Sequence, residues 1–372
     1  MTAIAQSASN ETFVLNLGPQ HPATHGVLRV KLVMDGEYIV EAEPVLGYIH
    51  RMHEKMGENR TWAQFLPNTG RMDYLHALAY NHNYVCLVER AAGIEVPERA
   101  EYIRVITNEL NRISSHLLWF GAFVLDLGGF SPLLYAFDDR EQILDLLEAV
   151  TGSRLTYCYY RFGGVYNDVD QDFLDGSKAF VARLRERMPM YHNLVTKNII
   201  LMKRLQDIGF IDAEMCRKYG ATGPVARGAG IDFDVRRHEP YSVYPRFDFD
   251  IPVYSGCDSM ARYMVRMDEM EQSMRIIEQA VGSIPEGPVM AAKAPKTIKP
   301  PKGDYYHAVE TARGSFGIRA VSDGTNTPYR MKLRTPSFSN LVTFGEAAKG
   351  MLLPDALALM GSLDLVIPEI DR

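Results

Sequence analysis

Apolar and polar residues alternate near the start of the chain, as they do in β-strands. The alternation covers residues 12–17, 27–34 and 38–43, and Asp35 with Gly36 supplies a tight turn between the last two runs. The sequence therefore predicts a small antiparallel sheet at the N-terminal end of the chain.

From residue 45 onward the apolar positions follow a helical period. The longest predicted helix begins after Pro97, and its apolar residues recur at alternating spacings of three and four. They form one stripe: Ile103, Ile106, Leu110, Ile113, Leu117, Phe120 and Val124. Beyond Leu117 the segment is apolar on every side, so we expect a central helix with Asp126 buried at its end. A purely structural role, in which Asp126 only accepts a backbone hydrogen bond, stays open.

Another helix is predicted before this one. A turn that starts at Gly70 leads into a helix that ends near Arg90. Asp73 is positioned to cap the exposed amides of this helix, which places Tyr74 in its first turn.

Further helices are predicted after the central one. Asp138 and Glu141 have the spacing of a capping box and predict a helix that ends near Val150. Residues 171–208, with a break at Pro189, form the next helical stretch, and residues 258–284 form the last long one. The segment between Leu117 and Phe137 is expected to be a buried helix end followed by a loop.

The last part of the chain changes character again. Five prolines between residues 284 and 302 predict an extended strap. Strands are predicted over residues 307–333, followed by a short helical segment. These elements describe an α+β protein with a central helical bundle and small antiparallel β regions near both ends. Its four parts are residues 1–46, a β-rich region; 47–283, the helical core; 284–302, the strap; and 303–372, the C-terminal β and helical region.

Composition narrows the possible functions. The 372 residues carry a net charge of −6 with a pI near 6.0, which argues against nucleic acid as a partner. The cysteines are far apart and form no Cys-x-x-Cys pair, so neither a disulfide framework nor a self-contained iron–sulfur or zinc site is expected. We expect no transmembrane segment, because Asp126 and Pro132 interrupt the most apolar stretch.

Candidate chemistry is concentrated in residues 18–26. Two prolines and two glycines exclude a regular helix or strand there, so the segment is a loop held between two predicted strands. The loop carries His21 and His25, which could present proton donors to a cavity. Two surface histidines in a turn are an equally acceptable interpretation, because this spacing outside a helix is a weak signal.

Four separated motifs resemble those of one family. They are Gly18–Gly26, Gly47–Arg51, Arg71–Tyr74 and Arg334–Phe338. Together they make the chain similar to the quinone-site subunit of proton-translocating NADH:quinone oxidoreductase, which is respiratory complex I. The likeness extends from about residue 12 to Arg372. It implies a fold like that of the large subunit of nickel–iron hydrogenases.

The hydrogenase likeness can be tested on the metal ligands. Hydrogenase large subunits hold nickel with two Cys-x-x-Cys pairs, whose positions fall here on Asp73, His76, Val366 and Glu369. No soft thiolate remains at these positions, although such a metal site needs them. We therefore expect no metal bound by this chain, and a former metal pocket that serves another purpose.

The resemblance assigns roles to individual residues. It implies that the pocket admits a quinone headgroup, lined by His21, with His25 and Tyr74 as hydrogen-bond partners and proton donors. It implies that Asp126 orients His25 and favours its charged form. Arg51 and Arg71 match arginines that lie close to the terminal iron–sulfur cluster in this family.

The resemblance also implies partners. A 4Fe–4S cluster must come from a neighbouring subunit, because this chain cannot ligate one. A membrane subunit at the quinone entrance, and a peripheral place on the cytoplasmic face of the bacterial cell membrane, are implied as well. Many relatives carry a histidine near the cluster where this chain has Thr156, so proton coupling at that position is in doubt.

Two other interpretations stay open at this point. The first is a nickel–iron hydrogenase large subunit, which the missing cysteines oppose. The second is a non-catalytic scaffold in which His21, His25 and Tyr74 only pack.

Overall fold

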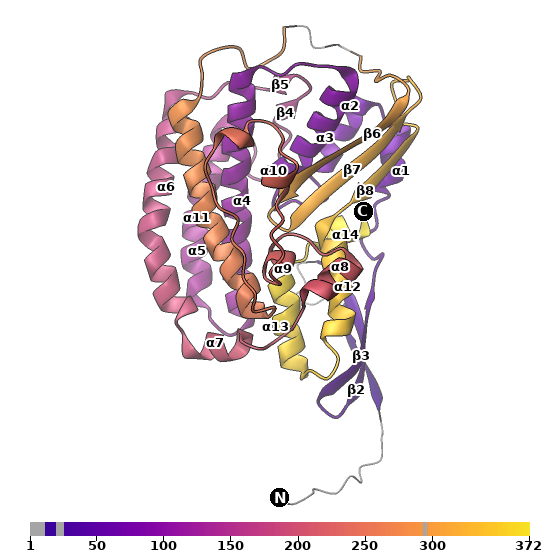
Figure 1. The fold of residues 1–372 in the computed structure, drawn as a ribbon, viewed down its shortest axis with the longest axis vertical. Helices are drawn as coiled ribbons and strands as arrows, with labels where there is room; N and C mark the ends of the chain where they lie inside the picture. Colours follow the sequence, from indigo (N-terminus) through magenta and orange to yellow (C-terminus); the bar gives the residue numbers. More distant parts are fainter. Residues whose placement is uncertain (1–11, 20–25, 293–294, 296) are drawn as a thin grey trace, which may run out of the picture.

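The fold is known from a computed structural model that describes residues 12–19, 26–292, 295 and 297–372. Long helices pack side by side as a bundle, and a twisted sheet lies beside them (Figure 1). The bundle consists of α4 (Glu98–Asp126), α5 (Ser131–Thr151), α6 (Gln171–Tyr191) and α11 (Ser259–Ser283).

The central helix is α4, which contacts both α5 and α11. Its predicted apolar stripe is fully buried, from Ile103 through Val124. Burial of several such side chains, at about 1.5–3 kcal/mol each, is the main force that holds the bundle together. The start of α4 after Pro97 confirms the sequence prediction, since proline fixes the φ angle and has no amide hydrogen to leave unpaired.

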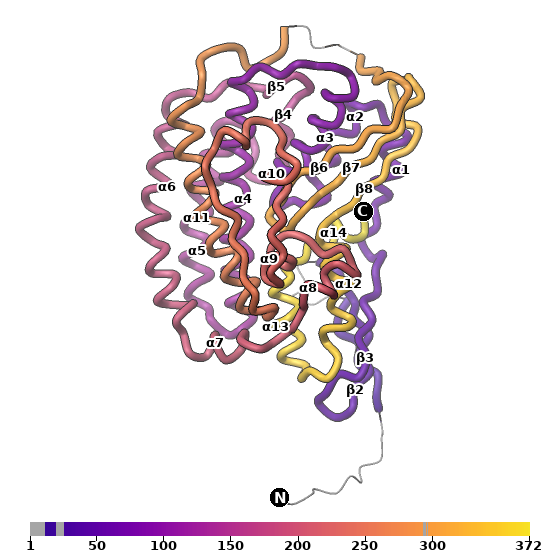
Figure 2. Tube along the Cα trace, viewed as in Figure 1, coloured from indigo at the N-terminus to yellow at the C-terminus, as the bar shows by residue number. Residues whose placement is uncertain are grey.

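The N-terminal sheet is antiparallel, in the order β1 (Phe13–Leu17), β2 (Arg29–Asp35) and β3 (Tyr38–Val45). It projects from one end of the molecule, next to the C-terminal helices (Figure 2). The contact is made by β3 with α12 (Pro336–Ala347). The first and last parts of the chain therefore build one wall together.

A second antiparallel sheet contains β6 (Gly303–Thr311), β7 (Gly314–Ser322) and β8 (Arg330–Arg334). Helix α3 (Ala77–Ala92) packs against β6 and β7, and α1 (His53–Asn59) packs against β8. The sheet thus connects the bundle with the segments that carry the candidate site.

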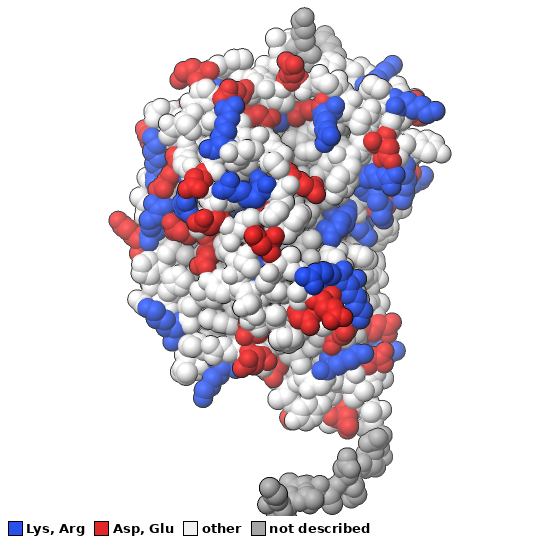
Figure 3. All heavy atoms as spheres, in the orientation of Figure 1, with Lys and Arg blue, Asp and Glu red and all other residues white. Residues whose placement is uncertain are grey.

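The remaining elements are short. They are α2 (Trp62–Thr69), β4 (Tyr160–Arg161), β5 (Gly164–Val165), the π-helix η2 (His192–Thr196), α7 (Ile199–Leu205), α8 (Ala213–Tyr219), α9 (Pro224–Arg227), α10 (Val235–His238), the 3₁₀ turn η3 (Tyr244–Arg246), α13 (Leu353–Leu363) and α14 (Ile367–Asp371). No helix within the described residues combines the length and apolar character needed to cross a lipid bilayer. Positive and negative side chains are mixed over the face in Figure 3, without a field of one sign.

The α+β fold class is confirmed, and the predicted strands and long helices are present. The prediction that a helix begins at Asp138 is wrong, because α5 begins at Ser131 with Pro132 in its first turn. The loop predicted to end near Phe137 is therefore mostly helix. Close packing of Leu133 against Gly121 of α4 favours the earlier start. The last part of the chain also forms α12, α13 and α14 rather than one short helical segment.

Candidate functional site

The four positions that match hydrogenase metal ligands lie in the interior of the protein, where Asp73 forms a buried ion pair. Arg313 donates from Nη1 to Asp73 Oδ2 at 2.7 Å and from Nη2 to Asp364 Oδ1 at 3.3 Å. These three side chains are at most 1% exposed. We call them, together with Glu369, the Asp73 pocket. Arg313 stands at the turn between β6 and β7, so the sheet delivers a positive charge into the pocket.

Both ring nitrogens of His76 form hydrogen bonds with the backbone. Its Nδ1 accepts a hydrogen bond from the Ala312 amide at 2.9 Å, and its Nε2 lies 3.1 Å from the Asn108 carbonyl oxygen. This pattern fixes the tautomer with the hydrogen on Nε2. Burial, followed by the charge of Arg112, lowers the pKa of His76 well below its usual range. The imidazole is therefore a neutral structural link.

Glu369 is fully buried and has little support for a negative charge. Its Oε1 accepts from the Ser337 amide at 2.8 Å, while its Oε2 has no hydrogen-bond partner in the described part of the chain. Burial and then the nearby charge of Asp73 raise its pKa well above the usual value. Burial and the neighbouring carboxylate therefore both favour the protonated form of Glu369.

These residues do not fit a nickel ion. Asp73 already accepts from the Leu75 and His76 amides and from Arg313, and Val366 has no donor side chain. A nickel site of the hydrogenase type needs soft thiolates, and the pocket offers none. The described residues also include no group of three or more His, Cys, Asp or Glu with the geometry to hold a metal ion.

Tyr74 lies beside this pocket and is partly exposed. It occupies the turn that precedes α3, so its predicted place in the first turn of a helix is wrong; Asp73 holds this turn by accepting amides ahead of the helix. No hydrogen bond joins the Tyr74 hydroxyl to another described residue. Burial first, and then the charges of Asp73 and Asp364 against that of Arg313, raise its pKa, so the phenol keeps its proton.

The loop with the two histidines starts and ends close to these groups. A Cβ atom on Gly18 would lie 2.1 Å from the Leu28 carbonyl oxygen, so the two ends of the loop nearly touch. A Cβ atom on Gly26 would lie 2.9 Å from Cβ of Ile367, in the helix that carries Glu369. His21 and His25 themselves lie outside the described residues. Their predicted roles stay predictions.

Arg51 and Arg71 both precede Tyr74 in the sequence, and they lie close together in the structure. Arg51 donates from Nη2 to the Arg71 carbonyl oxygen at 2.5 Å, and Arg71 donates from Nη1 to the Pro67 carbonyl oxygen at 3.1 Å. Burial and the charge of Arg71 lower the pKa of Arg51. Burial, followed by the charges of Arg51 and His50, lowers the pKa of buried His53 to about 4. The region is therefore locally positive.

The segment before Arg51 is anchored by the end of the chain. Asp371 accepts hydrogen bonds from the Gly47 and Ile49 amides, both at 2.9 Å. The Asp371 carbonyl oxygen lies 2.6 Å from Nδ1 of His50. One carboxylate thus sets the backbone that positions Arg51. Sequence reasoning did not single out Asp371, Arg313 or Asp364 as site residues. Their partners lie 51 or more positions away in the chain, so no local pattern marks these pairs.

Asp126 is exposed at the end of α4, so the expectation that it is buried is wrong. It lines a small cleft with Arg204 and residues of α13. The apolar run before it is mostly buried as far as Val124 and reaches the surface only at its end, where Leu125 is 39% exposed.

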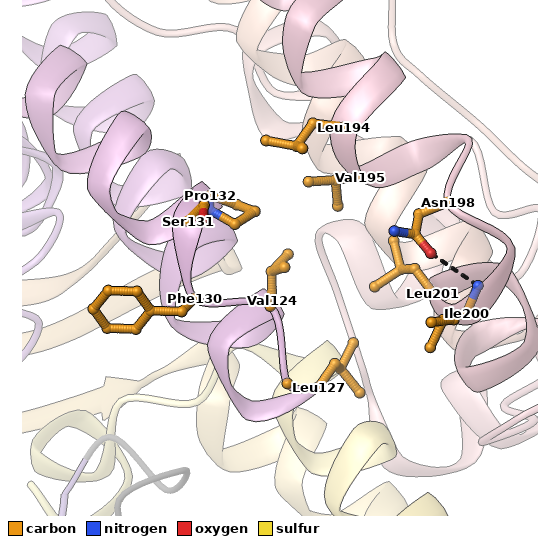
Figure 4. Close-up of a pocket in the computed structure, with 12 residues that line it drawn as sticks. Val124, Leu127, Phe130, Ser131, Pro132, Leu194, Val195, Asn198, Ile200 and Leu201 are labelled. Carbon is orange, nitrogen blue, oxygen red and sulfur yellow. Dashed lines mark hydrogen bonds between the residues drawn. The ribbon is translucent and has the colours of Figure 1, made fainter.

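An apolar pocket of about 270 Å³ lies at the same end of the bundle. Figure 4 shows Val124 and Leu127 of the α4 end facing Val195 and Leu201 from the η2–α7 segment. Ile199 and Ile200 next to it are 63% and 66% exposed. This end of the molecule thus presents apolar side chains to its surroundings.

Comparison with known proteins agrees with the motifs. The sequence pattern of the family described as "Respiratory-chain NADH dehydrogenase, 49 Kd subunit" matches residues 126–372. An NADH-quinone oxidoreductase subunit of Desulfotalea psychrophila is 73% identical over 98% of both chains. A subunit of the same name from Opitutus terrae is 67% identical over 100% of this chain and 93% of its own. Its counterpart in Syntrophobacter fumaroxidans is 59% identical over 98% of both. The resemblance is therefore confirmed, and the chain belongs to the 49-kDa subunit family of the respiratory NADH:quinone oxidoreductases, not to the hydrogenases.

Proposed function

We propose that this chain forms one wall of the quinone-reducing site of a respiratory NADH:quinone oxidoreductase. The observation that carries the proposal is the Tyr74 hydroxyl, which is partly exposed beside the Asp73 pocket and has no partner among the described residues. A buried or half-buried phenol normally finds a hydrogen-bond partner, so a free one is suited to a ligand. Family membership supports quinone as that ligand.

The reaction needs two electrons and two protons for each quinone. A neighbouring subunit's iron–sulfur cluster supplies the electrons when the complex is assembled. Tyr74, whose raised pKa keeps its proton in place, donates a hydrogen bond to one carbonyl oxygen of the quinone. His25 donates to the quinone from the loop opposite, with His21 in the same lining. Each donor can pass its proton to the oxygen as negative charge develops there.

Asp126 has a supporting role in this proposal. A carboxylate near His25 favours the imidazolium form and fixes the ring nitrogen that faces the quinone. We therefore assign it as a positioning residue for His25.

The partners follow from the same site. The paired Arg51 and Arg71 form a positive surface that suits the terminal 4Fe–4S cluster of a neighbouring subunit, because positive charge stabilises a reduced cluster. The apolar end of the bundle suits a membrane subunit at the quinone entrance, and the chain would sit peripherally on the cytoplasmic face of the membrane. Thr156 replaces a histidine found in many relatives, so no proton step is assigned there. Co-purification of the chain with both partners tests this arrangement.

The experiment that tests the site replaces Tyr74 with phenylalanine in the assembled complex. Loss of one neutral hydrogen bond weakens quinone binding by about 0.5–1.5 kcal/mol. Loss of a proton donor lowers the rate of quinone reduction by about a hundredfold or more. Electron transfer to an artificial acceptor upstream of the quinone should be unchanged.

Tyr329→Phe is the matched control, because Tyr329 is 71% exposed and distant in sequence. Asp126→Asn, measured in the same pair of assays between pH 6 and 8, should slow quinone reduction most at the alkaline end, where His25 loses its proton without a carboxylate. Equal loss of both activities in Tyr74→Phe, or of neither, contradicts the proposed site. A parental rate across this pH range in Asp126→Asn contradicts the role of Asp126.

A further inference from the structure

A second group of charged side chains is buried between α4, α11 and the β6–β7 hairpin. None of its members is more than 1% exposed, and hydrogen bonds or ion pairs link them all. We call it the Glu310 cluster: Glu109, Arg112, His116, Arg227, Asp234, Arg236, Glu269 and Glu310. The proposed quinone chemistry uses none of these residues.

In three of the four carboxyl groups of the cluster, hydrogen bonds from arginines stabilise the negative charge. Glu109 accepts from Arg112, Arg236, Tyr244 and Ser273, at 2.6–3.3 Å. Glu269 accepts from Arg227 at 3.1 Å and from Arg236 at 3.3 Å. Burial opposes the charge on Glu109, but Arg112 and Arg236 outweigh it and lower its pKa to about 2. These groups stay ionised at any physiological pH.

The negative charge of Asp234 is stabilised by an arginine in the same way. Arg236 donates to its two oxygens from Nε at 3.0 Å and Nη2 at 2.7 Å, and the Arg236 amide adds a bond at 2.9 Å. Burial acts against the charge, and Arg236 outweighs it, so the pKa of Asp234 is lowered.

Of the four carboxyl groups, Glu310 accepts the fewest hydrogen bonds. It accepts one guanidinium bond, from Arg227 Nη1 at 2.8 Å, and one amide bond, from Val235 at 3.2 Å. Arg227 also serves Glu269 and the Phe233 carbonyl oxygen, so its charge is shared. Burial and then the charge of Asp234 raise the pKa of Glu310 to about 7, against the effect of Arg227.

The charges of the cluster do not balance. Its three guanidinium groups face four carboxyl groups, and burial lowers the pKa of His116, so this imidazole is neutral. One negative charge is therefore uncompensated in the interior, which is costly. The adjacent charges do not compensate it, because Arg266 and Arg313 are matched by Asp73 and Asp364. A single bound proton removes the excess.

We propose that the Glu310 cluster is an internal proton-binding site, which holds one exchangeable proton on Glu310 and responds to charge at the candidate quinone site. Proton binding converts the Glu310 carboxylate to a carboxylic acid and breaks no covalent bond. The Arg227 hydrogen bond to Oε1 can persist while Oε2 carries the proton. The link to quinone rests on the proposed function, whereas proton binding itself does not.

The link follows from the β6–β7 hairpin. Glu310 is the last residue but one of β6, three residues before Arg313 in the β6–β7 turn, and Arg313 pairs with Asp73, the neighbour of Tyr74 in the sequence. Three residues span at most about 10 Å, and the turn brings their ends closer together. The intervening Ala312 amide donates to His76, and the Glu310 carbonyl oxygen accepts from Arg112 Nη2 at 2.7 Å. A new negative charge on a quinone next to Tyr74 would therefore act on Glu310 through the interior, where salt does not screen it.

The groups that face Glu310 come from several elements. Arg227 belongs to α9 and Arg236 to α10, with Asp234 just before it. Arg112 approaches from α4, and the Glu310 amide donates to the Tyr241 hydroxyl oxygen at 3.3 Å. The arginines keep their charge over the whole physiological range, and burial raises the pKa of Tyr241 above its usual value, so this phenol also keeps its proton. Glu310 is thus the group that titrates near neutral pH.

Infrared difference spectroscopy of the assembled complex tests the proton site. A pH change from 5 to 9 in the absence of quinone should remove a C=O stretching band of a protonated carboxyl group, with a midpoint near pH 7 and a shift in D₂O. Labelling with ¹³C-glutamate should move this band in the unmodified complex. Glu310→Gln should abolish it, and Glu310→Asp should retain a band. No such band, or an unchanged band in Glu310→Gln, overturns the proposal.

Glu89→Gln is the control, because Glu89 is also a buried glutamate but pairs with Arg104, which does not belong to the cluster. Its variant should keep the band with the parental midpoint. Loss of the band in Glu89→Gln would show that the signal does not come from Glu310.

The coupling is tested separately by reducing quinone. The negative charge that reduction brings to the site should raise the midpoint of the Glu310 band by up to about one pH unit. If Tyr74→Phe blocks quinone reduction, as the proposed function requires, an unchanged midpoint upon quinone reduction in the unmodified complex overturns the coupling. If Tyr74→Phe has no effect, the proposed function fails, and the pH titration without quinone still decides whether Glu310 binds the proton.

Discussion

Glu310 and Glu369 are both fully buried glutamates, yet their surroundings differ in one respect. Glu310 keeps one guanidinium partner, Arg227, at 2.8 Å. Glu369 has only the Ser337 amide, and its second oxygen has no hydrogen-bond partner in the described residues. The first is therefore balanced between its two protonation states near neutral pH, while the second stays protonated.

The comparison shows how a buried arginine sets the pKa of a buried carboxyl group. Burial alone raises the pKa far enough to fix the proton permanently. One shared guanidinium lowers it again to a range in which the proton can exchange. The same fold thus contains a firmly held proton on Glu369, at one of the positions that match hydrogenase metal ligands, and an exchangeable proton on Glu310. Three changes separate these effects.

Removal of Arg313 should have the largest effect. Arg313→Met leaves buried Asp73 without its guanidinium partner and Asp364 with Arg266 alone, and breaking such a buried pair costs about 3–5 kcal/mol. Chemical denaturation of the full chain measures the loss in free energy of unfolding. Arg319→Met is the control: it lies on the same sheet and pairs with Asp304, but at the surface, so its loss should hardly matter. Equal effects of the two variants would show that the Asp73 pair is not structural.

Glu310→Gln should have an intermediate effect that depends on pH. The folded pKa of Glu310 is about 7, above its reference value of 4.5, so the folded state binds the extra proton. The stability from Glu310 is thus fully present below about pH 4.5 and is lost as the pH rises through 7. The difference amounts to at most about 3.4 kcal/mol, from 1.36 kcal/mol for each of about 2.5 pKa units.

The variant should therefore match the parent near pH 5 and be the more stable of the two near pH 8. Thermal unfolding of both full chains at the two pH values measures this. A variant that is less stable than the parent at pH 8 would mean that ionised Glu310 is favoured, and the contrast with Glu369 would disappear.

Much of the fold could be predicted from the sequence, because local pattern decides it. The stripe on α4 recurs at helical spacing over seven apolar residues, and the alternation before Asp35 has the period of a strand. The start of α5 could not be read in this way. Asp138 and Glu141 match a capping box, yet packing of Leu133 on Gly121 extends the helix back to Ser131.

The candidate site was predictable only where a short motif carries it. Tyr74 and the paired Arg51 and Arg71 stand in or beside such motifs. Arg313 does not, because its partner Asp73 is 240 positions away and no local pattern marks the pair. The prediction that Asp126 is buried is wrong for a different reason. An apolar run indicates contact with other apolar groups, and here the run ends on an exposed surface instead of in the core.

Glu369→Gln should have the smallest effect of the three changes. A protonated carboxyl group and an amide have nearly the same shape, and the amide oxygen can still accept from Ser337. We expect a change in the free energy of unfolding of about 1 kcal/mol or less, with no dependence on pH between 5 and 8. Denaturation of the full chain at the two limits measures both.

Glu269→Gln provides the contrast, since Glu269 is equally buried but is held as a carboxylate by Arg227 and Arg236. The same substitution there leaves two guanidinium groups without part of their counter-charge and should cost about 3–5 kcal/mol. If Glu369→Gln were as damaging as Glu269→Gln, Glu369 would have to be ionised in the folded chain. The absence of an arginine partner would then not be what separates Glu369 from Glu310.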